Sequence, residues 1–159
     1  MILSLKELLE VLEKERQGKK VVFTNGCFDI IHAGHASYLK KAKELGDILV
    51  VGINSDSSIK RIKGEKRPIL SQDMRAYLLD SLKPVDYVVV FDEDTPLNLI
   101  KAIKPDVLVK GEDWSLESIV GADFVLSYGG KVERVPFEFN ISTSKIIERV
   151  LELYSREES

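Results

Sequence analysis

The two histidines of this 159-residue chain, His32 and His35, lie three residues apart with Gly34 between them. They follow an apolar, β-branched segment at the point where a helical pattern begins, and residues three apart share one face of a helix. A helix start offers free N–H groups and a positive dipole end, and glycine lets a ligand approach the backbone. Two imidazoles there could donate hydrogen bonds to phosphate oxygens as charge develops on them. The alternative is that one histidine caps the helix and the other is a surface residue.

A basic cluster forms a second candidate group in a chain whose net charge is −3. Eight consecutive positions contain five basic residues: Lys60, Arg61, Lys63, Lys66 and Arg67. Ammonium and guanidinium groups gathered in this way suit a phosphate or pyrophosphate. A charged face turned toward solvent is the alternative interpretation. The segment follows the second expected strand, so we expect it to be a loop.

Hydroxyl groups form the third candidate group. Ser142, Thr143 and Ser144 stand in succession, with Lys145 next, at the start of the last expected helix. Hydroxyl and N–H groups at a helix N-terminus can hold phosphate. An ordinary N-cap would account for one of these hydroxyls but hardly for three.

Composition excludes several classes of protein. The 23 basic and 26 acidic residues are well mixed, which disfavours general binding to nucleic acid or to a membrane surface. No apolar stretch approaches the 18 residues of a membrane span, and the charged N-terminus does not match a signal peptide, so a cytoplasmic protein is expected. The single Cys27 cannot form an intrachain disulfide, and with two histidines it falls short of a closed zinc site. We therefore expect no metal site formed by the protein itself.

Motifs of other chemistries are absent from the sequence. It contains no G-x-x-x-x-G-K-[ST], no G-x-G-x-x-G and no G-x-S-x-G, which argues against P-loop enzymes, dinucleotide dehydrogenases and α/β-hydrolases. Cys27, five residues before His32, could in principle be a nucleophile. Burial as a small apolar residue is the commoner role of such a cysteine.

The elements that must position these residues alternate along the chain. Apolar, β-branched runs predict strands over 19–26, 47–54, 85–91, 105–111 and 131–137. Helical spacing of apolar residues predicts helices within 1–17 and over 35–46, 71–82, 95–103, 115–130 and 142–154. Ser4 with Glu7 can form a capping box for the first helix, and Ser71 can cap the third. Such alternation predicts an α/β fold: a single-domain, Rossmann-like, doubly wound five-stranded parallel sheet, with ligands bound beyond the carboxyl ends of the strands.

The segments `TNGCFDIIHAGH` and, more than a hundred residues later, `ISTSK` resemble the HxGH nucleotidyltransferase superfamily, in its cytidylyltransferase-like branch. Within that branch the chain is most similar, over nearly its whole length, to the heptose 1-phosphate adenylyltransferases. The resemblance implies that heptose 1-phosphate attacks the α-phosphate of ATP, with Mg²⁺ on the triphosphate, giving pyrophosphate and the ADP-heptose used for lipopolysaccharide core synthesis. It also implies a homo-oligomer and, because no kinase module is recognised, a separate heptose kinase.

The resemblance also assigns roles to residues. Those expected at the nucleotide are Cys27, Phe28, His32, His35, Lys110, Gly111, Asp113, Ser142 and Thr143. Those expected at the sugar phosphate are Asp29, Lys60, Lys63 and Arg67, with Asp29 either ordering its loop or touching the sugar. His32, His35 and Lys63 would be catalytic, and Cys27 would form no covalent intermediate.

The chain departs from the heptose pattern in two places. Gly111, Glu112 and Asp113 replace a typical G-G-D and are closer to the G-D-D-W of glycerol 3-phosphate cytidylyltransferases. Asn140 replaces the usual glycine before the serine-threonine motif, and Phe137 stands where the cytidylyltransferases have arginine. The alternatives are therefore a CTP-dependent glycerol 3-phosphate cytidylyltransferase and a non-catalytic nucleotide-binding sensor.

Overall fold

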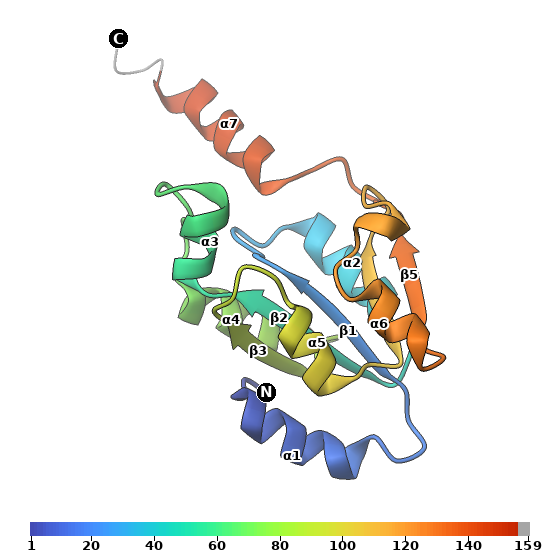
Figure 1. Cartoon of the computed structure of the whole chain (residues 1–159). Coiled ribbons are helices and arrows are strands. Elements are labelled where there is room, and N and C mark those ends of the chain that lie inside the picture. Colours follow the sequence, from blue (N-terminus) through green and yellow to red (C-terminus); the bar gives the residue numbers. More distant parts are fainter. Residues whose placement is uncertain (156–159) are drawn as a thin grey trace.

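A five-stranded sheet forms the centre of the computed structural model, which describes residues 1–155 (Figure 1). All neighbouring strands are parallel, in the order β3-β2-β1-β4-β5, as the alternating pattern predicts. The strands are β1 (Val21–Gly26), β2 (Ile48–Asn54), β3 (Tyr87–Phe91), β4 (Val107–Gly111) and β5 (Lys131–Val135). Every residue of β2 is buried, which explains why this strand is a continuous apolar run without alternation.

Helices cover both faces of this sheet. They are α1 (Leu5–Glu15), α2 (Ala33–Lys43), α3 (Asp56–Lys63), α4 (Gln72–Asp80), α5 (Leu97–Ile103), α6 (Ala122–Ser127) and α7 (Thr143–Tyr154), with a 3₁₀ turn at Leu116–Ser118. Val21 and Phe23 of β1 pack on the face covered by α1, α5 and α6, whereas Val22 packs on the face covered by α2 and α4. Alternate residues of one strand thus supply two cores, which makes the sheet doubly wound.

Two expected elements differ from the structure. The basic segment, expected as a loop, contains helix α3, whose N-cap Ser55 accepts a hydrogen bond from the Ser58 N–H and which buries Ile59. Because Ile59 is the only large apolar residue that α3 buries and most of its other residues are charged or polar, the segment shows little helical periodicity. The expected helix over 115–130 is divided at Gly121, whose φ is +86° and whose Cα faces Ile100 too closely for a side chain. The 3₁₀ segment ends at Ser118 before an extended Ile119, and the left-handed Gly121 is the N-cap from which α6 starts.

The sheet opens between β1 and β4. Strand β1 pairs with β2 from Val21 to Gly26, but it pairs with β4 only at Val22 and Phe23. From β1 the chain continues to β2 and β3 on one side, and β4 and β5 lie on the other, so the strand order reverses at this opening. Open α/β sheets bind ligands in the crevice at such a reversal.

The last helix, α7, leaves the body of the molecule after its first turn (Figure 1). None of its twelve residues is buried, although it carries a strongly amphipathic sequence. Residues 1–155 contain no helix with the length and apolar character needed to cross a bilayer.

Candidate active site

A cavity of about 290 Å³ lies at the carboxyl ends of β1 and β4, where the two strands diverge. It gathers twelve of the thirteen residues that the sequence assigned to substrate binding. These are Cys27, Phe28, Asp29, His32, His35, Lys63, Arg67, Lys110, Gly111, Asp113, Ser142 and Thr143. They come from the loop after β1, the starts of α2 and α7, the end of α3 and the segment after it, and the end of β4 and the loop after it, which only the fold brings together.

The two histidines form one stacked unit at the start of α2. His32 is the N-cap: its Nδ1 accepts the Gly34 N–H at 3.1 Å, and the Nδ1 of His35 accepts the His32 N–H at 3.2 Å. The ring centroids are 3.8 Å apart. Since each Nδ1 accepts, each neutral imidazole carries its proton on Nε2. Within the described residues the His32 Nε2 is buried and has no hydrogen-bond partner, so its N–H is free to donate to a ligand.

Burial keeps these imidazoles uncharged. It lowers the pKa of His35 to about 4, helped by the neighbouring His32 and opposed by Asp29. Burial also lowers the pKa of His32 below its ordinary value. At neutral pH the pair is therefore uncharged, with each proton on Nε2, and it lines the cavity at a helix start whose dipole also favours an anion. One histidine caps the helix, as the alternative interpretation holds, yet both line the cavity.

The loop that leads to the histidines is held in an unusual conformation. Phe28 and Ile30 have φ angles of 50° and 52°, in the left-handed region that non-glycine residues rarely adopt. Phe28 is 6% exposed, and its ring centroid lies 5.3 Å from that of His35. The Asp29 carboxylate accepts the Ile69 N–H at 2.7 Å and the Leu70 N–H at 2.9 Å. Asp29 therefore orders the loop, the first of the two roles expected for it.

Only part of the basic cluster reaches the cavity. Lys63 lines it together with Ile59, four residues earlier on the same face of α3, and Arg67 lines it from the following segment. Lys60 does not, because it follows Ile59 by one residue and so points about 100° away around the helix. Arg61 pairs instead with the Asp94 carboxylate at 2.8 Å, outside the cavity. The structure therefore places Lys60, which the resemblance assigned to the sugar phosphate, outside the cavity lining, because of the phase of a helix that the sequence did not reveal.

The three successive hydroxyls have three different contacts. Ser142 is the N-cap of α7 and accepts the Lys145 N–H, Thr143 donates to the Asp29 carbonyl, and Ser144 accepts from Arg67 at 3.1 Å. The bonds of Thr143 and Ser144 fasten the first turn of α7 to the loop after β1 and to the segment that carries Arg67. Ser142 and Thr143 still line the cavity, with the N-terminus of α7 directed toward it.

The wall formed by β4 combines a buried amine with exposed rings. Burial lowers the pKa of Lys110 to about 8; its Nζ donates to the Asn25 carbonyl and lies 5.2 Å from the centre of the Trp114 ring. Trp114 and Phe137 line the cavity while 43% and 56% exposed, respectively. Asn25 lines it too, and its buried Oδ1 has no partner within residues 1–155.

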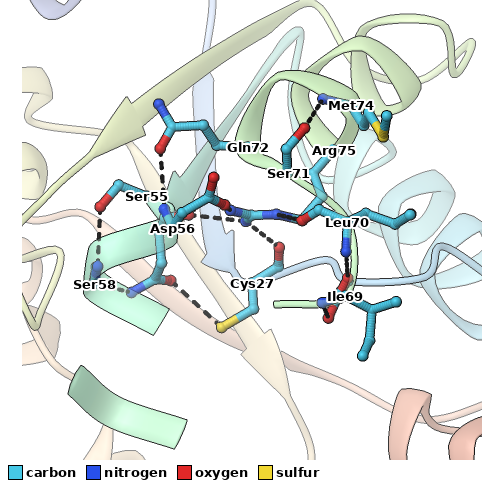
Figure 2. A network of polar contacts seen from close by, with 12 residues as sticks. Cys27, Ser55, Asp56, Ser58, Ile69, Leu70, Ser71, Gln72, Met74 and Arg75 are labelled. Atoms are coloured by element: carbon cyan, nitrogen blue, oxygen red, sulfur yellow. Dashed lines mark hydrogen bonds and ion pairs between the residues drawn. The ribbon is translucent and has the colours of Figure 1, made fainter. Parts of the chain in front are cut away.

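Several of these residues escaped sequence reasoning. Asn25 and Trp114 carry no local pattern that separates a cavity wall from ordinary surface, and Phe137 was noted only as a departure from the cytidylyltransferase arginine. Arg75 was also missed: it lies on the buried side of α4, fully enclosed, beneath the loop after β1 (Figure 2). A signal was available, since Arg75 directly precedes Ala76 and lies four residues before Leu79 on the apolar side of its helix.

Comparison with known proteins places this site in a family. The profile of the cytidylyltransferase-like family matches residues 23–149, so the chain belongs to that family. It is 56% identical over 147 residues to the bifunctional protein HldE of Geobacter sulfurreducens, covering 92% of this chain, and 60% identical over 149 residues to HldE of Helicobacter pylori, covering 94%. The chain spans only 30% and 31% of the lengths of these relatives.

Solved structures agree with this placement. A lipopolysaccharide core biosynthesis protein from Thermoplasma volcanium is 32% identical, with a TM-score of 0.62, and the match covers 78% of this chain and all of that one. A pantoate-β-alanine ligase from Francisella tularensis is 17% identical with a TM-score of 0.65, covering 96% of this chain and 78% of that one. The second likeness concerns the fold alone.

Proposed function

We propose that this nucleotidyltransferase transfers the adenylyl group of ATP to heptose 1-phosphate, releasing pyrophosphate and forming ADP-heptose for lipopolysaccharide core synthesis. The observation that carries the proposal is the stacked pair of His32 and His35, two imidazoles that line a cavity at the reversal of strand order. The resemblance of nearly the whole chain to heptose 1-phosphate adenylyltransferases supports a heptose 1-phosphate acceptor, and the name of the Thermoplasma relative supports lipopolysaccharide synthesis.

The reaction we propose is a single in-line displacement. An oxygen of the sugar phosphate forms a bond to the α-phosphorus, and the bond from that phosphorus to the bridging oxygen breaks, with its electron pair leaving on pyrophosphate. The histidine Nε2–H groups would donate to phosphoryl oxygens as charge develops, and Lys63 and Arg67 would supply positive charge from the facing wall. Such catalysis consists of positioning and electrostatic stabilisation, so it needs no covalent intermediate.

Cys27 has no covalent role in this scheme. Burial is the largest influence on its thiol and raises the pKa above the ordinary value, although Lys63, Arg75 and Lys110 oppose that shift. A thiol that stays protonated at neutral pH is a poor nucleophile. The thiol instead contacts a neighbouring side chain: its Sγ lies 3.9 Å from the Asn54 Oδ1.

We propose that Mg²⁺ enters with the triphosphate. Two carboxylates line the cavity, and the oxygens of Asp29 already accept backbone N–H groups, so Asp113 is the side chain available to meet a metal there. Residues 1–155 include no cluster of three potential metal-binding side chains. When bound, Mg²⁺ would neutralise triphosphate charge, while the protein's cationic and N–H groups would hold the remaining oxygens.

A second candidate is glycerol 3-phosphate cytidylyltransferase, which the loop after β4 favours. Its Glu112, Asp113 and Trp114 resemble the cytidylyltransferase sequence, and the last two line the cavity. The chemistry would be the same, with CTP and glycerol 3-phosphate as substrates. In the heptose reaction a heptose kinase activity must supply the sugar 1-phosphate.

A substrate screen tests these proposals. We expect pyrophosphate release from ATP, Mg²⁺ and heptose 1-phosphate, and little from CTP and glycerol 3-phosphate. The reverse preference would establish the second candidate, and nucleotide binding without turnover would establish a sensor.

The histidine assignment has its own test. His32→Ala or His35→Ala should lower turnover by roughly 100-fold or more while leaving the fold intact, since each acts on transition-state charge. The matched control is Lys60→Ala, which changes a basic residue outside the cavity. A variant that loses stability but keeps its activity per folded molecule would contradict the catalytic role.

A further inference from the structure

Arg75 is a fully buried guanidinium at the centre of four chain segments (Figure 2). Its Nη1 donates to the carbonyl oxygens of Cys27 and Asn54, both at 2.8 Å, and its Nε donates to the carbonyl of Leu70 at 3.1 Å. Its Nη2 donates to the Asp56 carboxylate at 2.8 Å. Arg75 does not line the cavity, so it is outside the reach of a substrate held there.

The partners of Arg75 belong to the parts that form the site. Cys27 begins the loop that leads to the histidines, Asn54 ends β2, and Asp56 starts the helix that carries Lys63. Leu70 ends the segment that carries Arg67. A single side chain therefore ties the histidine wall of the cavity to its basic wall.

A second set of hydrogen bonds holds the backbone at Ile69 and Leu70, beside Arg75. The N–H of Leu70 donates to Asp29, and the carbonyl of Leu70 accepts from Arg75. Both polar groups of one residue are thus fixed by the loop after β1 and by α4, and the neighbouring Ile69 N–H is fixed by Asp29 as well. Through Thr143, which donates to the Asp29 carbonyl, the same loop also holds the first turn of α7.

The chemistry of arginine explains why this position is demanding. A buried cation costs several kcal/mol in lost hydration unless charge and hydrogen bonds compensate for it. Here one carboxylate and three carbonyls do so, arranged around the planar fork of a guanidinium. An ammonium group is a compact point charge and lacks the fork needed to reach these separate acceptors together.

We propose that Arg75 is a positioning residue that sets the distance between the histidine wall and the basic wall of the cavity without touching either substrate. Its effect on catalysis rests on the proposed function, whereas its effect on loop order does not. Arg75→Lys tests both. Arg61→Lys is the matched control, because Arg61 also bonds a carboxylate and a carbonyl but is exposed and outside the cavity.

The first measurement is amide hydrogen exchange on the full chain without substrate. Arg75→Lys should accelerate exchange at Ile69 and Leu70 at least 10-fold while leaving the β2 amides protected, and Arg61→Lys should change neither. Unchanged exchange at the two amides, or acceleration that includes β2 equally, would overturn the proposal. If Arg75→Lys does not fold, Asp56→Asn removes the charged partner, and the same local acceleration is expected.

The second measurement is steady-state kinetics under conditions in which each variant is folded. We expect kcat/KM for the acceptor to fall at least 10-fold in Arg75→Lys and to stay near wild type in Arg61→Lys. Wild-type kinetics together with accelerated exchange would overturn the positioning role. If the wild-type chain releases no pyrophosphate at all, the proposed function fails, while the exchange result still decides whether Arg75 orders these segments.

Discussion

The buried histidine pair makes the stability of this protein depend on pH. The pKa of His35 is about 4 in the folded chain and near 6.5 when the residue is exposed. Between these values the unfolded chain binds the extra proton, so the free energy of unfolding falls as the pH falls. The full difference is about 3 kcal/mol, and about 2 kcal/mol of it is lost between pH 7 and pH 5. His32, with its pKa also lowered, adds to the loss in the same direction.

The variant His35→Gln isolates this contribution. Glutamine does not titrate, and at the N3 position of a helix it can accept the N-cap N–H as His35 Nδ1 does. Urea unfolding followed by far-ultraviolet circular dichroism at pH 7 and pH 5 would give the loss of stability for each protein. We expect the wild type to lose about 2 kcal/mol more than His35→Gln.

Equal losses in the two proteins would refute this reasoning. They would mean that His35 takes up its proton at an ordinary pH in the folded state, and hence that its Nδ1 is not held as an acceptor. The assignment of the proton to Nε2, on which the proposed phosphate contact depends, would then fall as well.

Three further outcomes are expected. Lys63→Ala should lower kcat/KM by roughly 10-fold or more at low salt, with a smaller deficit at high salt. Lys60→Ala should match the wild type in the same kinetic series. Equal behaviour of the two variants would mean that the basic cluster is only a solvent-exposed charged surface. Cys27→Ser should keep substantial turnover, with inversion at the α-phosphorus when a chiral ATP analogue is used, and net retention would require a two-step mechanism. Helix α7 exposes an apolar face that includes Leu151, which is 58% exposed, so we expect the chain to self-associate. Leu151→Glu should weaken that association in analytical ultracentrifugation, and a wild-type chain that stays monomeric at ~100 µM would contradict the expectation.

The sequence alone was enough to predict the sheet and the histidine pair. Strand β2 reads as a buried parallel strand because its residues before the terminal Asn54 are apolar or glycine, and a helix start beside Gly34 follows from local spacing. The capping box of Ser4 and Glu7 was likewise predictable, since it involves contacts only three residues apart. Features of this kind depend on short-range geometry, which the order of residue types fixes directly.

The tertiary structure decided which side chains meet. Lys63 reaches the cavity and Lys60 does not because α3 turns by about 100° per residue, and the phase of that helix is set by the burial of Ile59 beside the sheet. The position of Arg75 on the apolar side of α4 indicates burial, but the acceptors from four segments that make a buried cation tolerable there meet only in the folded chain. The cavity itself exists because β1 and β4 pair over only two residues and then diverge. These outcomes depend on contacts between segments far apart in the chain, whose directions are fixed only when the whole sheet packs.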